Sequence, residues 1–75
     1  MKVSDKSINQ RVRVTAVNGS MASRGEEGFI SEVRGYDYRF GKIVGRRIMV
    51  WIDKTASGQP TRRVVSMSSN EVEAA

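Results

Sequence analysis

Residues 24–33 read RGEEGFISEV and place two glycines, Gly25 and Gly28, three positions apart and directly before an apolar segment. Glycine adopts positive φ angles without steric cost, so such a pair can turn the chain sharply into a strand. A second strand signal lies upstream, because residues 11–17 alternate apolar and polar side chains and are followed by the turn dipeptide Asn-Gly at 18–19. The sequence therefore predicts two strands joined by a loop that ends in a glycine turn.

Further strands are predicted downstream, and no segment has the apolar periodicity of an amphipathic helix. The strongest signal is residues 47–52, which are β-branched and aromatic. Residues 61–67 are predicted as the fourth strand, and 68–72 as a tight turn with a short fifth strand. The segment 35–46 is the least defined, and its glycines indicate a turn.

The predicted core is the aliphatic face of these strands. Its expected members are Val12, Val14, Ile48, Val50 and Ile52. The second strand, expected over residues 28–34, has two possible registers, because both Phe29 and Ile30 are apolar and either one can face the core.

The succession of strand, loop, G-x-x-G and strand over residues 10–52 resembles the KOW motif of ribosomal and transcription-elongation proteins. This resemblance implies an all-β fold, a small five-stranded Src-homology-3-like barrel. It also implies nucleic-acid contacts through loop tips and the glycine turn, here Arg24, Gly25 and Gly28. One departure weakens phosphate binding at the turn, since KOW proteins usually carry basic residues where this chain has two glutamates.

Length and composition limit the possible functions. The 75 residues make one domain, expected at 10–73, with a flexible segment at 1–9 and a tail at 74–75. The chain has no cysteine and no histidine, so we expect no catalytic residues, metal or cofactor, and no enzyme activity. A small protein without disulfides suits the reducing cytoplasm. No apolar run approaches the roughly 20 residues of a membrane span.

The charge balance favours an anionic partner. Thirteen Lys and Arg oppose eight Asp and Glu, which gives a net charge of +5, and arginine outnumbers lysine by nine to four. Guanidinium groups form flat forks that suit phosphate and stack on aromatic rings, so the bias is typical of nucleic-acid binding. A generally basic, solvated surface is the alternative. The predicted nucleic-acid contacts are Arg11, Arg13, Arg24, Tyr36, Tyr38, Arg39, Arg46, Arg47, Trp51, Arg62 and Arg63.

The aromatic residues allow two interpretations. Tyr36, Tyr38 and Phe40 recur with period two, which places their rings on one side of an extended chain. They can form a stacking platform for a single strand, or they can cover the barrel opening. Trp51 can likewise stack on a base beside Arg47, or pack inward as part of a satellite core.

The sequence thus predicts a non-enzymatic module that binds nucleic acid, either RNA or single-stranded DNA, through an arginine- and aromatic-lined barrel face. The alternative is an accessory subunit that docks on a larger machine, such as a polymerase or ribosome, through Trp51 and the segment 36–40. A third possibility is weak homo-oligomerisation through exposed strand edges instead of a monomer.

Overall fold

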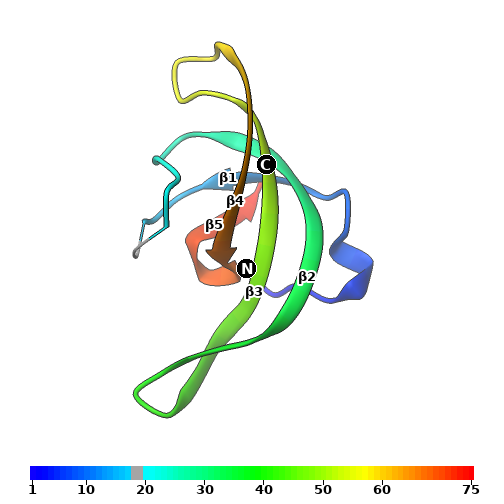
Figure 1. The fold of residues 1–75 in the computed structure, drawn as a ribbon, viewed down its shortest axis with the longest axis vertical. Helices are drawn as coiled ribbons and strands as arrows, with labels where there is room; N and C mark the ends of the chain where they lie inside the picture. Colours follow the sequence, from blue (N-terminus) through cyan, green and yellow to red (C-terminus); the bar gives the residue numbers. More distant parts are fainter. Residues whose placement is uncertain (18–19) are drawn as a thin grey trace.

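The chain folds into one five-stranded antiparallel sheet in the computed structural model, which describes residues 1–17 and 20–75 (Figure 1). In chain order the elements are the 3₁₀ turn η1 (Asp5–Ser7), β1 (Arg11–Val14), β2 (Glu27–Arg39), β3 (Lys42–Lys54), β4 (Pro60–Ser68), the 3₁₀ turn η2 (Ser69–Glu71) and β5 (Val72–Ala74). The strand order is β4-β3-β2-β1-β5. The predicted all-β class is confirmed, while the sheet is open, with β4 and β5 at its edges. The predicted turn at 18–19 lies outside the described residues.

The predicted core is confirmed. The five expected aliphatic residues are all buried, with exposed fractions of 2% or less. The second strand takes the register that buries Ile30, and Phe29 points to the other face. The rest of the buried apolar core consists of Ala22, Val65, Met67 and Val72.

The first strand is shorter than predicted, because it ends at Val14 and not at residue 17. The amides of Thr15 and Ala16 donate to the carbonyl oxygen of Glu71, at 2.9 and 3.2 Å. The chain therefore leaves β2 at this point and follows η2. An alternating sequence does not reveal that a distant carbonyl will take these two donors.

The second and third strands are longer than predicted. The segment 35–46, expected to contain an irregular turn region, continues both strands and pairs with itself as the outer part of the β2–β3 hairpin. Its turn is at Phe40 and Gly41, which have φ angles of +53° and +75°. Two successive positive φ angles define the two-residue turn that matches the twist of a hairpin. Gly45 lies within β3 and opposes Asp37.

The two glycines, Gly25 and Gly28, are needed for different reasons. Gly25 has a φ of +87°, as the turn prediction requires. Gly28 lies in β2, where a Cβ atom would collide with the backbone carbonyl of Trp51 and lie 2.9 Å from the Cα of Ile52. Gly28 is therefore needed because β2 and β3 approach each other closely, and not because of a positive φ.

The two ends of the described chain pack against the sheet. The predicted turn and short fifth strand are confirmed as η2 and β5, and the Glu71 carboxylate accepts a hydrogen bond from the Ser68 amide at 2.9 Å. At the other end, residues 1–9 contain η1, and Met1 and Val3 pack against the core. The Asn9 amide donates to a β2 carbonyl at 2.7 Å, so this segment lies on the domain.

Candidate nucleic-acid interface

The outer half of the β2–β3 hairpin forms an arm, defined here as residues 34–47, that extends beyond the rest of the sheet (Figure 1). β4 pairs with β3 only from Arg47 onward, and β1 pairs with β2 only up to Phe29. Between Arg47 and its tip, the arm is therefore a ribbon of two strands. The pairing of Arg39 with Lys42 closes the tip.

The aromatic residues of the arm lie at the surface. Tyr36 and Tyr38 are 59% and 61% exposed, and Phe40 is fully exposed in the turn. Ile43 opposes Tyr38 across the ribbon and is 57% exposed. The predicted single row of three rings is not continuous, because the positive φ of Phe40 ends the strand alternation at Arg39. The rings therefore face solvent and do not cover the core.

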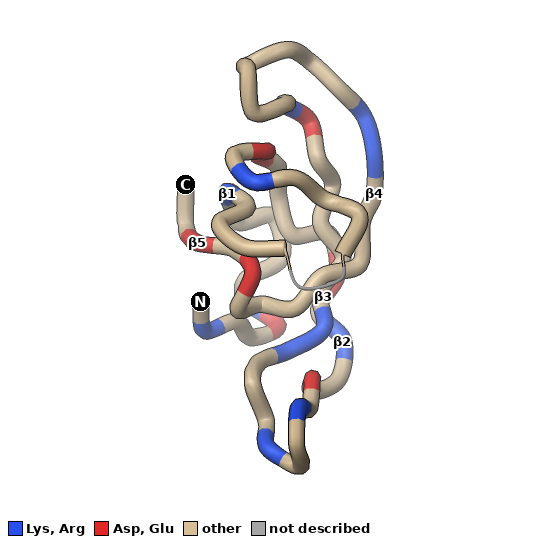
Figure 2. The backbone as a smooth tube through the Cα atoms, turned by 90° about the vertical axis from the view of Figure 1, so that its left-hand side faces the viewer, with Lys and Arg blue, Asp and Glu red and all other residues tan. Residues whose placement is uncertain are grey.

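Most of the net charge of the protein lies on the arm. Its 14 residues carry five basic side chains and one acidic side chain, a net charge of +4 out of the +5 of the whole chain. The rest of the sequence is nearly balanced, with eight basic and seven acidic residues. Figure 2 shows this contrast, because the basic positions dominate the projecting hairpin while both signs alternate over the body.

A cation–π contact joins the two strands at the base of the arm. The guanidinium carbon of Arg46 lies 4.9 Å from the centroid of the Tyr36 ring. The Nε atom of Arg46 donates to the carbonyl oxygen of Arg34 at 2.8 Å, and its backbone amide donates to Ser69 Oγ at 2.9 Å. These contacts hold a flat, cationic side chain against an exposed ring, which is a suitable surface for stacking a base.

The single acidic residue of the arm is already paired. Asp37 accepts from the guanidinium of Arg47, with nitrogen–oxygen distances of 3.0 and 3.1 Å to its two carboxylate oxygens. In contrast, none of the ion pairs found among the described residues involves Lys42 or Arg46. The structure thus leaves cationic groups on the arm that can meet an external anion.

Two of the predicted contact arginines form ion pairs across the body of the sheet. Arg11 binds Asp53 through two hydrogen bonds of 2.7 and 3.0 Å, and this interaction lowers the pKa of the Asp53 carboxyl. Arg13 lies 3.4 Å from Glu73 and 3.9 Å from Glu27. These carboxylates reduce the field that either arginine presents to a phosphate.

A third predicted contact, Arg63, holds the β1–β2 loop. Its guanidinium donates to the Glu26 carboxylate at 2.6 Å, and the Ser23 amide donates to the same carboxylate oxygen at 2.6 Å. Burial raises the pKa of Glu26, but the hydrogen bonds from Arg63 and Ser23 outweigh it, so the pKa is lowered overall. Because Glu26 is only 4% exposed, we assign its pair with Arg63 to the stability of the fold.

The last two predicted arginines, Arg24 and Arg62, lie at the end of the sheet opposite the arm tip. Arg62 follows Pro60, which opposes Lys54 at the end of β3. Arg24 precedes β2, whose first residue, Glu27, also opposes Lys54. Both arginines are exposed, and neither takes part in an ion pair among the described residues. The predicted basic residues therefore do not form one continuous patch.

The tryptophan is part of an outer cluster. Trp51 is partly buried and stacks on Phe29, with ring centroids 6.3 Å apart and an interplanar angle of 13°. It also opposes Val64, which is 47% exposed. Trp51 lies on β3 outside the arm, five residues beyond Arg46, the residue that opposes Tyr36. Of the predicted contacts, the arm brings together Tyr36, Tyr38, Arg39, Arg46 and Arg47.

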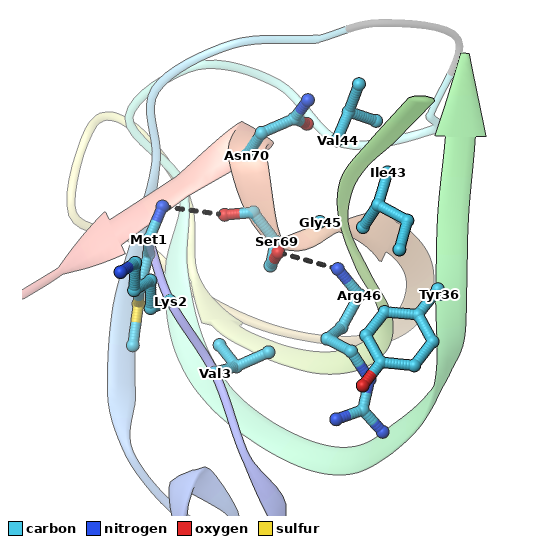
Figure 3. Close-up of a pocket in the computed structure, with 10 residues that line it drawn as sticks. All are labelled: Met1, Lys2, Val3, Tyr36, Ile43, Val44, Gly45, Arg46, Ser69 and Asn70. Atoms are coloured by element: carbon cyan, nitrogen blue, oxygen red, sulfur yellow. Dashed lines mark hydrogen bonds between the residues drawn. The ribbon is translucent and has the colours of Figure 1, made fainter. Parts of the chain in front are cut away.

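A groove opens between the base of the arm, η2 and the first residues of the chain (Figure 3). It has a volume of about 660 Å³ and is lined by residues 1–3 and 43–46 together with Tyr36, Ser69 and Asn70. Its cationic side chains come from Lys2 and Arg46, and no acidic residue is among those that line it. The groove could not be predicted from the sequence, because its walls come from distant segments, such as Met1 and Ser69, which are 68 residues apart.

The described residues contain no cluster of three or more potential metal ligands, and no helix in this part of the chain is long and apolar enough to cross a membrane. Comparisons with protein-family models, with curated proteins and with solved structures found no match for this chain. The geometry and charge of the arm are therefore the features that point to a function.

Proposed function

We propose that this protein is a small, non-enzymatic nucleic-acid-binding module that contacts RNA or single-stranded DNA through its β2–β3 arm. The observation that supports this proposal most strongly is the combination, on one projecting ribbon, of a net charge of +4 and three exposed aromatic rings. Exposed arginine and lysine attract the phosphate backbone, and exposed rings stack on unpaired bases.

Each part of the arm has a role in this proposal. Arg39 and Lys42 at the tip contact phosphates and supply the electrostatic part of the affinity. Tyr36 and Tyr38 stack on bases whose faces are free, and this favours single strands, since the bases of a duplex already stack on one another. Arg46 contributes both charge and a planar surface beside Tyr36.

We also propose that the fold is a Src-homology-3-like barrel of the KOW type, working in the cytoplasm. Five antiparallel strands and the pairing of the last strand with the first support this assignment. The KOW resemblance places nucleic-acid contacts at the glycine turn, but the paired, buried Glu26 makes that turn unfavourable for phosphate. The arm takes over that role in our proposal.

One observation favours protein docking as a second candidate function. Phe40 is fully exposed at the tip of the ribbon, where a phenylalanine can insert into an apolar pocket of a larger assembly. Docking predicts that Phe40→Ala abolishes retention of a specific protein partner. Nucleic-acid binding predicts instead that this variant retains most of its oligonucleotide affinity, because the tyrosines and basic residues remain.

The test of the proposed function is a titration of a fluorescent single-stranded oligonucleotide at two salt concentrations. If phosphate contacts drive binding, the affinity falls steeply as salt rises, because bound counterions are released on association. Absence of measurable affinity even at low salt would remove the proposal and leave docking as the better account.

A further inference from the structure

The groove at the base of the arm has the size and chemistry of a small-ligand site. Its volume of about 660 Å³ falls within the range of about 300–1,000 Å³ typical of such sites. It is too small for a duplex but large enough for a nucleobase with its sugar and phosphate. It also adjoins the Tyr36–Arg46 contact, so a strand that follows the arm passes its opening (Figure 3).

The charges of the groove favour an anion. Lys2 lies on the first segment of the chain and Arg46 on β3, on two different sides of the groove (Figure 3). Neither residue takes part in an ion pair among the described residues, and the groove lining includes no carboxylate. A phosphate placed here therefore meets positive charge without competition from an internal acid.

The other lining residues suit a planar base. Val3, Ile43 and Val44 supply apolar surface, and the exposed Asn70 supplies an amide with both a donor and an acceptor. Such a combination of apolar walls and few polar groups is typical of ligand sites. The amide of Asn70 can hydrogen-bond to the edge of a base. Contacts to the phosphate alone do not recognise the base.

The shape of the groove depends on a glycine. A Cβ atom at Gly45 would collide with Ser69 Oγ, so a larger residue at this position would displace that hydroxyl. The Arg46 amide then donates to the same Ser69 hydroxyl at 2.9 Å, which joins the base of the arm to η2. The groove is thus bounded by backbone that hydrogen bonds hold in place.

We infer that this groove binds one unpaired nucleotide, with its base against the apolar wall and its phosphate near Lys2 and Arg46. The inference rests on the proposed function and adds a defined subsite to it. A mononucleotide can occupy the groove without spanning the arm, so the subsite can be tested separately from the binding of a long strand.

The experiment is a titration of the full chain with a nucleoside 5′-monophosphate, followed by the amide shifts in nitrogen–proton NMR spectra. We expect saturable shifts at Gly45, Arg46 and Asn70, and none at the tip residues Arg39 and Lys42. Inorganic phosphate is the matched probe without a base. Equal shifts with phosphate alone, or no shifts at the groove, overturn the inference.

Two matched variants sharpen the test. Ile43→Glu places a carboxylate in the groove, and Val64→Glu makes the same change at an exposed β-branched residue on β4. We expect Ile43→Glu to weaken mononucleotide binding by about tenfold or more, because like charges placed together are unfavourable. Val64→Glu should bind as the wild type does, and equal losses in both variants contradict the inference.

The results separate the two proposals. If a single-stranded oligonucleotide binds with a steep salt dependence while the mononucleotide leaves the groove amides unchanged, the subsite is wrong and the arm proposal stands. If the mononucleotide fills the groove but no oligonucleotide binds, the arm proposal is wrong and the groove is a nucleotide site in its own right.

Discussion

The guanidinium of Arg46 stacks 4.9 Å from the centre of the Tyr36 ring, across the base of a hairpin that carries most of the net charge of the protein. The same arginine is held by Arg34 through its Nε atom and by Ser69 through its amide. This contact orders a cation and an aromatic ring before any ligand arrives, which reduces the entropic cost of binding.

Arg46→Lys tests this preorganisation. Lysine keeps the positive charge but lacks the flat guanidinium that contacts the ring, so we expect a loss of about two- to fivefold in affinity, equivalent to an exposed cation–π contact. The salt dependence should not change, because the charge remains. Fluorescence anisotropy with a single-stranded oligonucleotide provides the measurement, and Arg62→Lys at the opposite end of the sheet is the control. Equal losses in the two variants would show that the Tyr36 contact is not involved.

Gly28→Val should destabilise the fold by about 3 kcal/mol, on the scale of overpacking a tightly packed interior. The added side chain would collide with the backbone carbonyl of Trp51, and a backbone atom cannot move aside as a flexible side chain can. Gly35→Val is the matched control, because nothing lies within 4 Å of a Cβ atom at that position of the same strand. Thermal unfolding of the two variants checks this prediction, which fails if Gly28→Val melts at the same temperature as Gly35→Val.

Arg63→Ala should lower the free energy of unfolding by about 1–3 kcal/mol, because it removes a charged hydrogen-bond donor from the nearly buried Glu26 carboxylate. Arg62→Ala removes the same charge from the residue just before Arg63. Arg62 has no ion pair among the described residues, so this variant should change stability little. Urea unfolding measures both. Similar midpoints for the two variants would mean that the Glu26 contact does not stabilise the fold.

The lowered pKa of Glu26 predicts how stability depends on pH. The folded state holds this carboxyl in its charged form more strongly than the unfolded state, whose pKa is near the ordinary value of 4.5. Its contribution is therefore complete above pH 4.5 and is lost as the pH falls through the lower pKa of the folded protein. Glu26→Gln cannot titrate, so the difference in melting temperature between wild type and variant should shrink as the solution is acidified below pH 4.5. A constant difference from pH 7 to pH 3 would contradict this assignment.

The strand framework could be predicted because each signal was local. Ile48, Val50 and Ile52 alternate with residues of the other face, and burial follows that alternation. The arm could not be predicted in the same way, because the glycines at 41 and 45 indicated a break, whereas only Gly41 lies in the turn. Whether two polar segments pair as strands depends on the residues of both segments, so neither segment alone predicts the pairing.

The types of residue at the candidate site could be predicted from the sequence, but which of these residues lie together in the structure could not. The tyrosines and the basic side chains of the arm lie close together in sequence, so a local pattern could identify them. Arg11 and Asp53 are 42 residues apart, and nothing in the sequence shows that they pair. Ion pairs of this kind decide which arginines stay available, and they form only when the sheet is assembled.

The most direct test of the central claim compares two double variants that remove the same charge from opposite ends of the sheet. R39A/K42A acts at the tip of the arm, and R24A/R62A acts at the other end. For the wild type we expect the logarithm of the association constant for a single-stranded oligonucleotide to fall against the logarithm of salt concentration with a slope of roughly −2 to −5. R39A/K42A should flatten that slope by about one to two units, because each lost phosphate contact removes about 0.7–0.9. R24A/R62A should keep the wild-type slope, and equal flattening by both variants would contradict an interface located on the arm.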